Sequence, residues 1–128
     1  LYFPTANVTD TRGNRFTATT LVQVHDVAAL DTLLQGKWRA MKDALRAGDI
    51  ARAVTHIVAD SRADYEAAFG VIAARLPNIG AILTDVGLIE VRNDSAIYEA
   101  TRTDGGVVKS FEVRFALDDD GVWRIEAF

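Results

Sequence analysis

Residues 107–128 read VVKSFEVRFALDDDGVWRIEAF, and this closing stretch decides the fold class. Apolar and polar residues alternate over 107–117 and again over 122–128, and a period of two predicts β-strands. Between the two runs, three aspartates and Gly121 supply the residue types that build tight turns. The stretch therefore predicts an antiparallel hairpin at the end of the domain.

The period of two continues toward the amino terminus, over 96–102 and 88–92. Asn93-Asp94 separates these two runs, and an Asp-Gly-Gly sequence at 104–106 separates the later one from the closing hairpin. Four strands joined by short turns predict an antiparallel meander. Segment 79–85 fits either a short helical turn or a first strand.

A first amphipathic helix is expected ahead of these strands. Asp31 or Thr32 can cap it after a junction at 25–30, and Gly48 suits the left-handed position that ends a helix. Its apolar residues recur at helical spacing, so they are expected to face the core. They are Leu34, Trp38, Met41 and Leu45.

Two more helices are expected between Asp49 and Pro77. Asp49 can cap the second, and Ser61 with Asp64 has the spacing of a capping box that opens the third, which Pro77 ends. The apolar stripes are Ile50, Ala53, Val54, Ile57 and Val58, and then Tyr65, Phe69, Ile72 and Leu76. Helices followed by a meander predict an α+β fold, with three N-terminal helices packed on a curved antiparallel sheet.

The first 24 residues carry a separate pattern of period two around the turn sequence DTRGN at 10–14. An isolated hairpin is marginal in water, so its apolar face is expected to lie on further strands. That face comprises Tyr2, Ala6, Val8, Phe16, Ala18, Val22 and Val24. Both ends of the sequence read as strand, and we interpret it as a piece of a larger protein, with a hairpin remnant at 1–26 and an α+β domain at 27–128.

Two resemblances accompany these patterns. VTDTRGN at 8–14, followed by a strand ending VQV at 22–24, resembles the last two strands of bacterial immunoglobulin-like or PKD-type repeats. A two-stranded arm belonging to the next domain is the alternative for this segment. Trp38, GDI at 48–50, Tyr65 with Phe69, FEVRF at 111–115 and DGVWRI at 120–125 resemble the NTF2-like superfamily across about 34–128. That resemblance implies a cone whose mouth can hold a small ligand, in enzymes and in members without activity.

The composition disfavours several classes of partner and chemistry. The formal charge is −4, and residues 79–128 hold ten acidic against five basic side chains, which disfavours binding to nucleic acid or to an anionic membrane surface. Cysteine is absent, which excludes thiolate catalysis and cysteine-ligated zinc. No apolar run approaches the roughly 20 residues that span a bilayer, so no membrane insertion is expected.

Three inward-facing residues are the candidates for ligand binding: Tyr65, Tyr98 and Arg102. Both tyrosines lie in apolar stripes and carry a hydroxyl that needs a partner when buried. The alanines beside Tyr98 either leave a cavity above the sheet or form the floor on which the helices rest. No catalytic residue, metal or cofactor is assigned, because His25 and His56 are isolated and the acidic turn lacks a ligand shell.

Two functions remain open at this point. The favoured one is a non-enzymatic structural, docking or assembly module of a larger secreted or surface-attached bacterial protein. Its partners would be neighbouring domains of the same chain, a second copy, or another protein. The alternative is a small apolar-ligand-binding domain or enzyme of the NTF2-like fold. A cavity with two or more buried ionisable groups favours the alternative, and a cone filled by large aromatic side chains favours the first.

Overall fold

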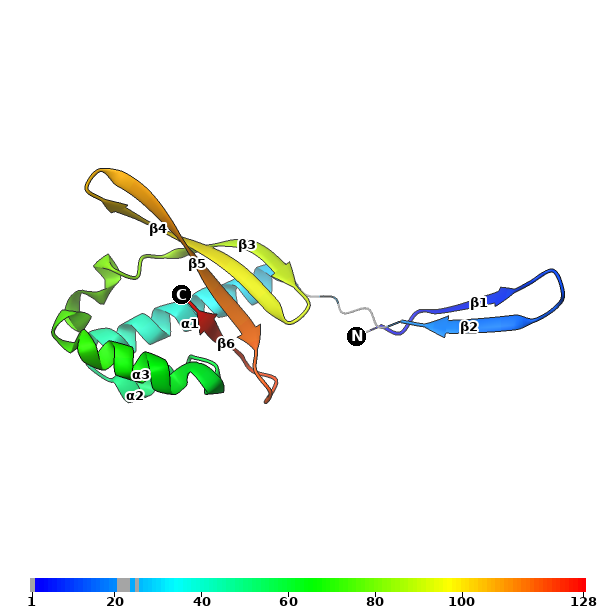
Figure 1. Ribbon diagram of the computed structural model, residues 1–128, viewed down its shortest axis with the longest axis horizontal. Helices are drawn as coiled ribbons and strands as arrows, with labels where there is room; N and C mark the ends of the chain where they lie inside the picture. Colours follow the sequence, from blue (N-terminus) through cyan, green and yellow to red (C-terminus); the bar gives the residue numbers. More distant parts are fainter. Residues whose placement is uncertain (1, 21–23, 25) are drawn as a thin grey trace.

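The computed structural model describes residues 2–20, 24 and 26–128, which form an α+β structure with two antiparallel sheets (Figure 1). We call residues 26–128 the α+β body. No helix in the described ranges is long and apolar enough to cross a membrane. The elements are β1 Thr5–Thr9, β2 Arg15–Thr19, α1 Val27–Arg46, α2 Ile50–Val54, the 3-10 helix η1 Ala59–Ser61, α3 Arg62–Val71, the 3-10 helix η2 Ala73–Ala81, β3 Val86–Arg92, β4 Ser95–Asp104, β5 Val107–Leu117 and β6 Trp123–Ala127.

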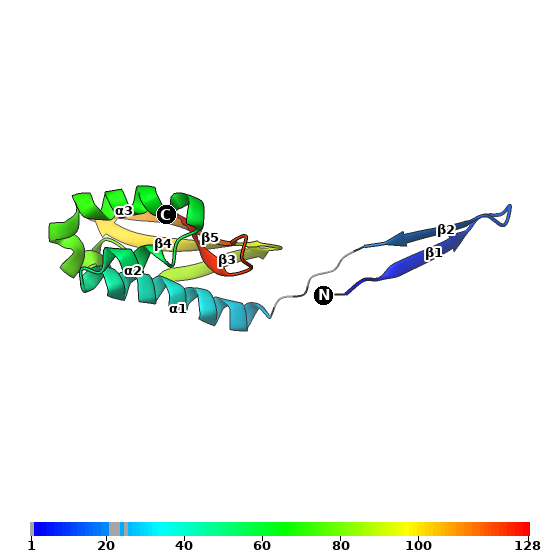
Figure 2. The ribbon, with the colours of Figure 1, turned by 90° about the horizontal axis from the view of Figure 1, so that it is seen from below.

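Strands β1 and β2 form the hairpin that the first alternating pattern predicts. The Asp10 carboxylate accepts hydrogen bonds from the backbone of Arg12 at 2.8 Å and of Asn14 at 2.9 Å, and Gly13 takes a φ of +85°. These contacts explain why the sequence turns here. Figures 1 and 2 both show the hairpin beside one end of the α+β body rather than packed on it. Val22, assigned to its apolar face, lies outside the described residues.

Helix α1 begins one turn earlier than the sequence pattern suggests. Its cap is Asp26, whose carboxylate accepts a hydrogen bond from the backbone N–H of Ala29 at 3.0 Å. The two expected caps, Asp31 and Thr32, both lie inside the helix. After α1, Gly48 has a φ of +74° and Asp49 accepts a hydrogen bond from the backbone of Arg52, so the predicted helix end and the predicted cap of α2 are confirmed.

The second and third helices are shorter than expected. Helix α2 has five residues and packs against α1, and α3 packs against α2 and ends at Val71. Pro77 lies within η2, so it does not end α3. Ser61 makes no capping hydrogen bond with its side chain, so the expected capping box is wrong.

The four-stranded sheet has the order β3-β4-β5-β6, and the predicted meander is confirmed. The expected arrangement of three N-terminal helices packed on a curved sheet is wrong. The helices follow a hairpin, and the main helix contacts with the sheet are those of α1 with β3 and β6. Its stripe is continuous and fully buried, whereas the stripe assigned to the second helix is divided: Val54 closes α2, and Ile57 belongs to an extended segment beyond it.

That extended segment adds to the outer edge of β6. Ile57 and Ile125 form a parallel bridge in which the Val58 N–H donates to the Ile125 carbonyl and the Ile125 N–H donates to the His56 carbonyl, each at 2.9 Å. Both isoleucines are fully buried. A pairing that joins residues so far apart leaves no periodic signal in the sequence, and the alternating pattern did not predict it.

Strands β4 and β5 run past their outer neighbours. Strand β3 pairs with β4 as far as Ala100, and β6 pairs with β5 from Arg114 onward. We call residues 101–113 the distal arm, which projects from the end of the body opposite the hairpin (Figure 1). The inward face of β4 changes character along this path, from buried Tyr98 and Ala100 to partly exposed Arg102.

Candidate functional site

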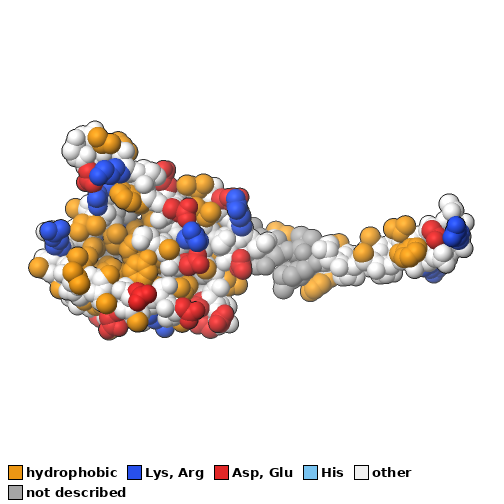
Figure 3. Space-filling model, in the orientation of Figure 1, with side chains coloured by type: hydrophobic (Ala, Val, Ile, Leu, Met, Phe, Trp, Pro, Cys, Tyr) orange, Lys and Arg blue, Asp and Glu red, His pale blue; other side chains and the backbone are white. Residues whose placement is uncertain are grey.

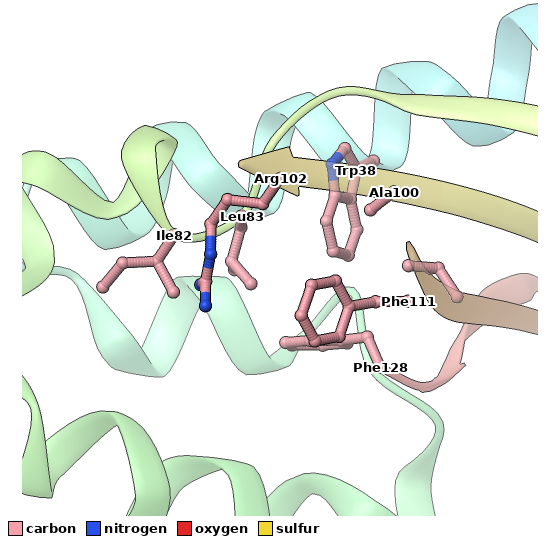
Figure 4. A pocket seen from close by; sticks show the side chains of 8 residues that line it. Trp38, Ile82, Leu83, Ala100, Arg102, Phe111 and Phe128 are labelled. Carbon is pink, nitrogen blue, oxygen red and sulfur yellow. The ribbon is translucent and has the colours of Figure 1, made fainter. Parts of the chain in front are cut away.

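A small apolar pocket lies at the base of the distal arm (Figure 4). Its volume is about 210 Å³. Side chains from α1, from the segment after η2, from β4 and β5, and from the residue after β6 converge on it. They are Trp38, Ile82, Leu83, Ala100, Arg102, Phe111, Val113 and Phe128. Figure 3 shows hydrophobic side chains gathered on the face of the body below the arm.

Trp38 is the buried wall of this pocket. It belongs to the apolar stripe of α1, and its indole N–H donates a hydrogen bond to the Thr84 carbonyl at 2.8 Å. The same carbonyl accepts a hydrogen bond from Lys42, whose ammonium also pairs with Asp85 at 2.7 Å. Helix α1 therefore fixes the segment that carries Ile82 and Leu83 into the pocket.

Phe128 forms the adjoining wall. Its ring meets Trp38 edge-on at 5.2 Å and stacks on Tyr65 at 4.7 Å between centroids. The Phe69 ring also stacks on Phe128, with 6.3 Å between the two ring centroids. Aromatic rings at these separations attract one another beyond the area they bury, so Phe128 is held by three neighbours.

The third ring, Phe111, borders the opening. Phe111 is 43% exposed, so its ring does not fill the core. The Arg102 guanidinium lies over this ring at 5.3 Å from the centroid. Figure 4 shows Arg102 reaching toward the same hollow as Ile82 and Leu83.

Arg102 is the charged residue among those that line the pocket, and it is already paired. Its Nε and Nη2 donate to the two oxygens of Asp104 at 3.1 and 2.7 Å, and Lys109 approaches the same carboxylate at 3.3 Å. These hydrogen bonds, Arg102 first, hold the pKa of Asp104 below its usual value. Two of the five guanidinium donors are therefore held by Asp104, and this carboxylate offsets the charge that Arg102 presents at the rim.

The structure separates the three sequence-predicted ligand residues. Arg102 lines the pocket, whereas Tyr65 is not among the lining residues and stacks on Phe128 instead. Tyr98 is fully buried beneath α1, where its hydroxyl donates to Asp31 at 2.8 Å. Burial, followed by this hydrogen bond, raises the pKa of the Tyr98 phenol well above its usual value. A buried phenol that donates to a carboxylate on α1 links that helix to the sheet.

Sequence reasoning missed most of the pocket. A bulge lies between the pairings of Ile125 and Ala127 with β5, and a strict period of two does not include a bulge, so the sequence pattern does not predict that Phe128 reaches the pocket. Ile82 and Leu83 lie in the segment that the pattern left as helix or strand. The aromatic character of the lining was visible in the sequence, but the convergence of five chain segments was not.

The other polar clusters have structural partners. In the turn at 118–121, Arg124 pairs with Asp118 at 2.8 Å and with Asp120 at 2.6 Å, and Gly121 takes a φ of +76°, as a simple hairpin turn requires.

His56 is half-buried after α2, and burial, then nearby Lys37 and Arg52, lowers its pKa. His25 lies outside the described residues. Within the described ranges, no three His, Cys, Asp or Glu side chains lie together as a metal site would require.

No protein-family model matches the chain, no curated protein matches it, and no solved structure matches its fold. The resemblances to the NTF2-like superfamily and to immunoglobulin-like repeats stay predictions.

Proposed function

We propose that the α+β body is a non-enzymatic docking module whose pocket takes one apolar side chain of a protein partner. The observation that carries this proposal is the size of the pocket together with its lining. A volume of about 210 Å³ between Trp38, Phe111 and Phe128 falls below the roughly 300–1,000 Å³ of pockets that hold drug-sized ligands. It suits a single aromatic or branched aliphatic group.

The polar groups at the pocket support a binding role over a catalytic one. General acid–base catalysis needs a titratable group within hydrogen-bond reach of the reacting atoms. Among the residues lining this pocket, Arg102 is the one with a charge, and Asp104 accepts hydrogen bonds from two of its nitrogens. Such a site offers shape, aromatic contact and one neutralised cation at the rim.

A free small apolar compound is the second candidate occupant. It is favoured by the three rings around the hollow, since each presents an edge or face to a planar guest. The two candidates differ in the size of molecule they accept. A pocket for one side chain takes toluene and excludes two-ring compounds, whereas a ligand cavity takes naphthalene as well.

Titration of the protein with toluene, followed by two-dimensional NMR, tests the proposal. The expected result is a shift of the Trp38 indole N–H and of the amides of Ala100 and Val113. Ala100→Leu fills the pocket and should abolish the shift, while the matched change Ala63→Leu, at an exposed position of α3, should preserve it. Unchanged spectra for the wild-type protein at toluene saturation would remove the basis for a docking pocket.

The wider setting of the module rests on the sequence. A spacer, docking or assembly unit of a larger secreted or surface-attached bacterial protein is the setting that the immunoglobulin-like resemblance of the hairpin implies. The exposed apolar face of β1 and β2 supports this setting, because such a face needs a covering partner. Locating the full-length protein in fractionated cells tests this part separately.

A further inference from the structure

We propose that the docking partner is a second copy of this chain, whose β1–β2 hairpin adds to the open edge of β5 and places Phe16 at the pocket. This inference rests on the proposed function, since it names the side chain that the pocket takes. It joins two features that have no partner among the described residues: the edge of β5 beyond the end of β6, and the exposed apolar face of the hairpin.

The open edge belongs to the distal arm. Strand β5 extends over eleven residues, but β6 pairs with it only from Arg114 to Leu117 within the described chain. Residues 107–113 therefore present backbone donors and acceptors on the side where β6 has ended. Exposed edges of this kind accept an additional strand from another chain.

An added strand would bring side chains directly to the pocket. Phe111 and Val113 are on the inward face of β5, and both line the pocket. Neighbouring strands lie about 4.8 Å apart, and residues opposite each other point to the same face. A strand laid along 107–113 would continue the line of β6 beyond Phe128, so an inward side chain on it would lie beside Phe111.

The hairpin offers a strand of the right pattern. Val8 and Phe16 are directly paired on one face and are 60% and 59% exposed. The other face is polar and internally hydrogen-bonded, between the hydroxyls of Thr5 and Thr19 at 3.1 Å and from Thr17 to Asn7 at 2.7 Å. Each strand has five residues, which fits within the seven-residue open edge. The polar face can therefore remain in solvent, whereas the face with Val8 and Phe16 is the one suited to contact another chain.

The formal charges of the two parts favour contact between the hairpin of one molecule and the α+β body of another. Arg12 and Arg15 against Asp10 give residues 1–25 a formal charge of +1, which leaves −5 for residues 26–128. Two hairpins would meet with like charge, and two bodies would repel more strongly. The pairing of hairpin with body is the combination in which opposite charges approach.

The contact has to form between molecules. Figures 1 and 2 show the hairpin at the α1 amino-terminal end of the body, and the tip of the distal arm at the opposite end. Each copy therefore offers its hairpin at one end and its open edge at the other. Such a head-to-tail contact is heterologous, and with the hairpin and the edge at opposite ends of each copy we expect it to extend into chains of several copies rather than stop at a symmetric dimer.

Sedimentation velocity over a concentration series tests the proposal on the chain of residues 1–128. The expected result is a sedimentation coefficient that keeps rising with concentration, without a plateau at the dimer. Phe16→Lys removes the hairpin contact and Phe111→Lys removes the edge contact, so each variant alone should sediment as a monomer. Thr19→Lys, on the polar face of the same hairpin, is the matched control and should still assemble. Circular dichroism verifies that each variant is folded.

The decisive measurement mixes the two lysine variants. One supplies an intact edge and the other an intact hairpin, so the mixture should form a one-to-one dimer that neither variant forms alone. Failure of the mixture to combine, or assembly of Phe16→Lys alone, would overturn the proposal and point to symmetric contacts. Wild-type protein that stays monomeric would also overturn it and assign the hairpin face to another chain or segment. Toluene binding is measured independently, so the docking pocket can stand when the second-copy partner fails.

Discussion

The hydroxyl of Tyr65 contacts both backbone polar groups of Phe128. It accepts a hydrogen bond from the Phe128 N–H at 3.0 Å and donates one to the Phe128 carbonyl at 3.4 Å, while the two rings stack at 4.7 Å. Phe128 follows the last residue of β6, where strand pairing has ended. A side chain of α3 thus takes the place of a neighbouring strand and fixes one wall of the pocket.

Replacing Tyr65 with Phe should release this contact while keeping the ring. We expect the free energy of unfolding to fall by about 1 kcal/mol, since two partly buried backbone groups lose their protein partner. Toluene should also bind more weakly, because the Phe128 wall becomes mobile. Urea denaturation and the NMR titration measure the two effects. Tyr2→Phe, in the exposed hairpin, is the control, and equal stability of both variants would refute a structural role for the Tyr65 hydroxyl.

The two tryptophans should differ in their contribution to stability. Trp38 is 1% exposed and central to the core, so Trp38→Ala should cost about 3–5 kcal/mol. The alternating pattern places Trp123 on the inward face of its strand, but the structure leaves it half-buried at the edge of the core. Trp123→Ala should therefore lower the free energy of unfolding clearly less than Trp38→Ala does. Guanidinium titration of the two variants measures the difference. The reverse order would mean that the closing hairpin, rather than α1, carries the core.

The acidic turn should make stability depend on pH below neutrality. Hydrogen bonds from Arg124 lower the pKa of the Asp120 carboxyl to about 2 in the folded chain, from an ordinary value of 3.8. A carboxyl whose pKa is lower in the folded state favours folding while it is ionised. This contribution is complete above about pH 4 and is lost as the pH falls toward 2.

The urea midpoint measured between pH 6 and pH 2 checks this expectation. Asp120→Asn should lower the midpoint near neutrality and flatten its fall in acid. Asp119→Asn, in the same turn, is the matched control, because the Asp119 carboxylate makes no ion pair with the described residues. Parallel pH curves for wild type and Asp120→Asn would contradict the assignment.

Removing residues 1–24 should leave a cooperatively folding body. The hairpin strands are exposed throughout, and Asp26, which caps α1, is retained. Thermal unfolding by circular dichroism should give one sharp transition with little change in midpoint. A broad, non-cooperative melt would show that the hairpin shares the core of the body, and it would contradict the division at residue 26.

The sequence predicted well those elements whose signals are local. The bounds of β5 match the alternating run at 107–117, and Gly13, Gly48 and Gly121 all take the positive φ that their turns require. Asp49 caps α2 because its side chain needs only the next turn of backbone. Each of these signals lies within a few residues of the structure it specifies.

Competing local signals produced the errors. Asp26 and Asp31 are both acceptable helix caps, and sequence alone does not show that Tyr98 takes Asp31 as its hydrogen-bond partner. The stripe assigned to the second helix continues through Ile57, because an isoleucine at helical spacing looks the same whether it faces a helix or a strand. In both cases a contact with the distant sheet decided between two locally sound alternatives.

The pocket was the least predictable part. Arg102 was identified as a candidate because it continues the inward face of β4, and the structure places it at the rim. Phe111 lies on the distal arm, past the point where β6 stops pairing with β5, and it is partly exposed beside the pocket. How far β5 extends past β6 depends on the lengths of both strands and on their register. The sequence of either strand alone does not specify it.

The bridge between Ile57 and Ile125 also has a kinetic consequence. The helices can form early from local contacts, but the segment at 56–58 finds its partner only when β6, which is synthesised long after it, arrives. Closing so long a loop is slow, and until it closes, Ile57 and the inner face of β5 remain accessible to other chains. The interval before this closure is when a nascent chain is most vulnerable to misassembly, and β6 sets its length.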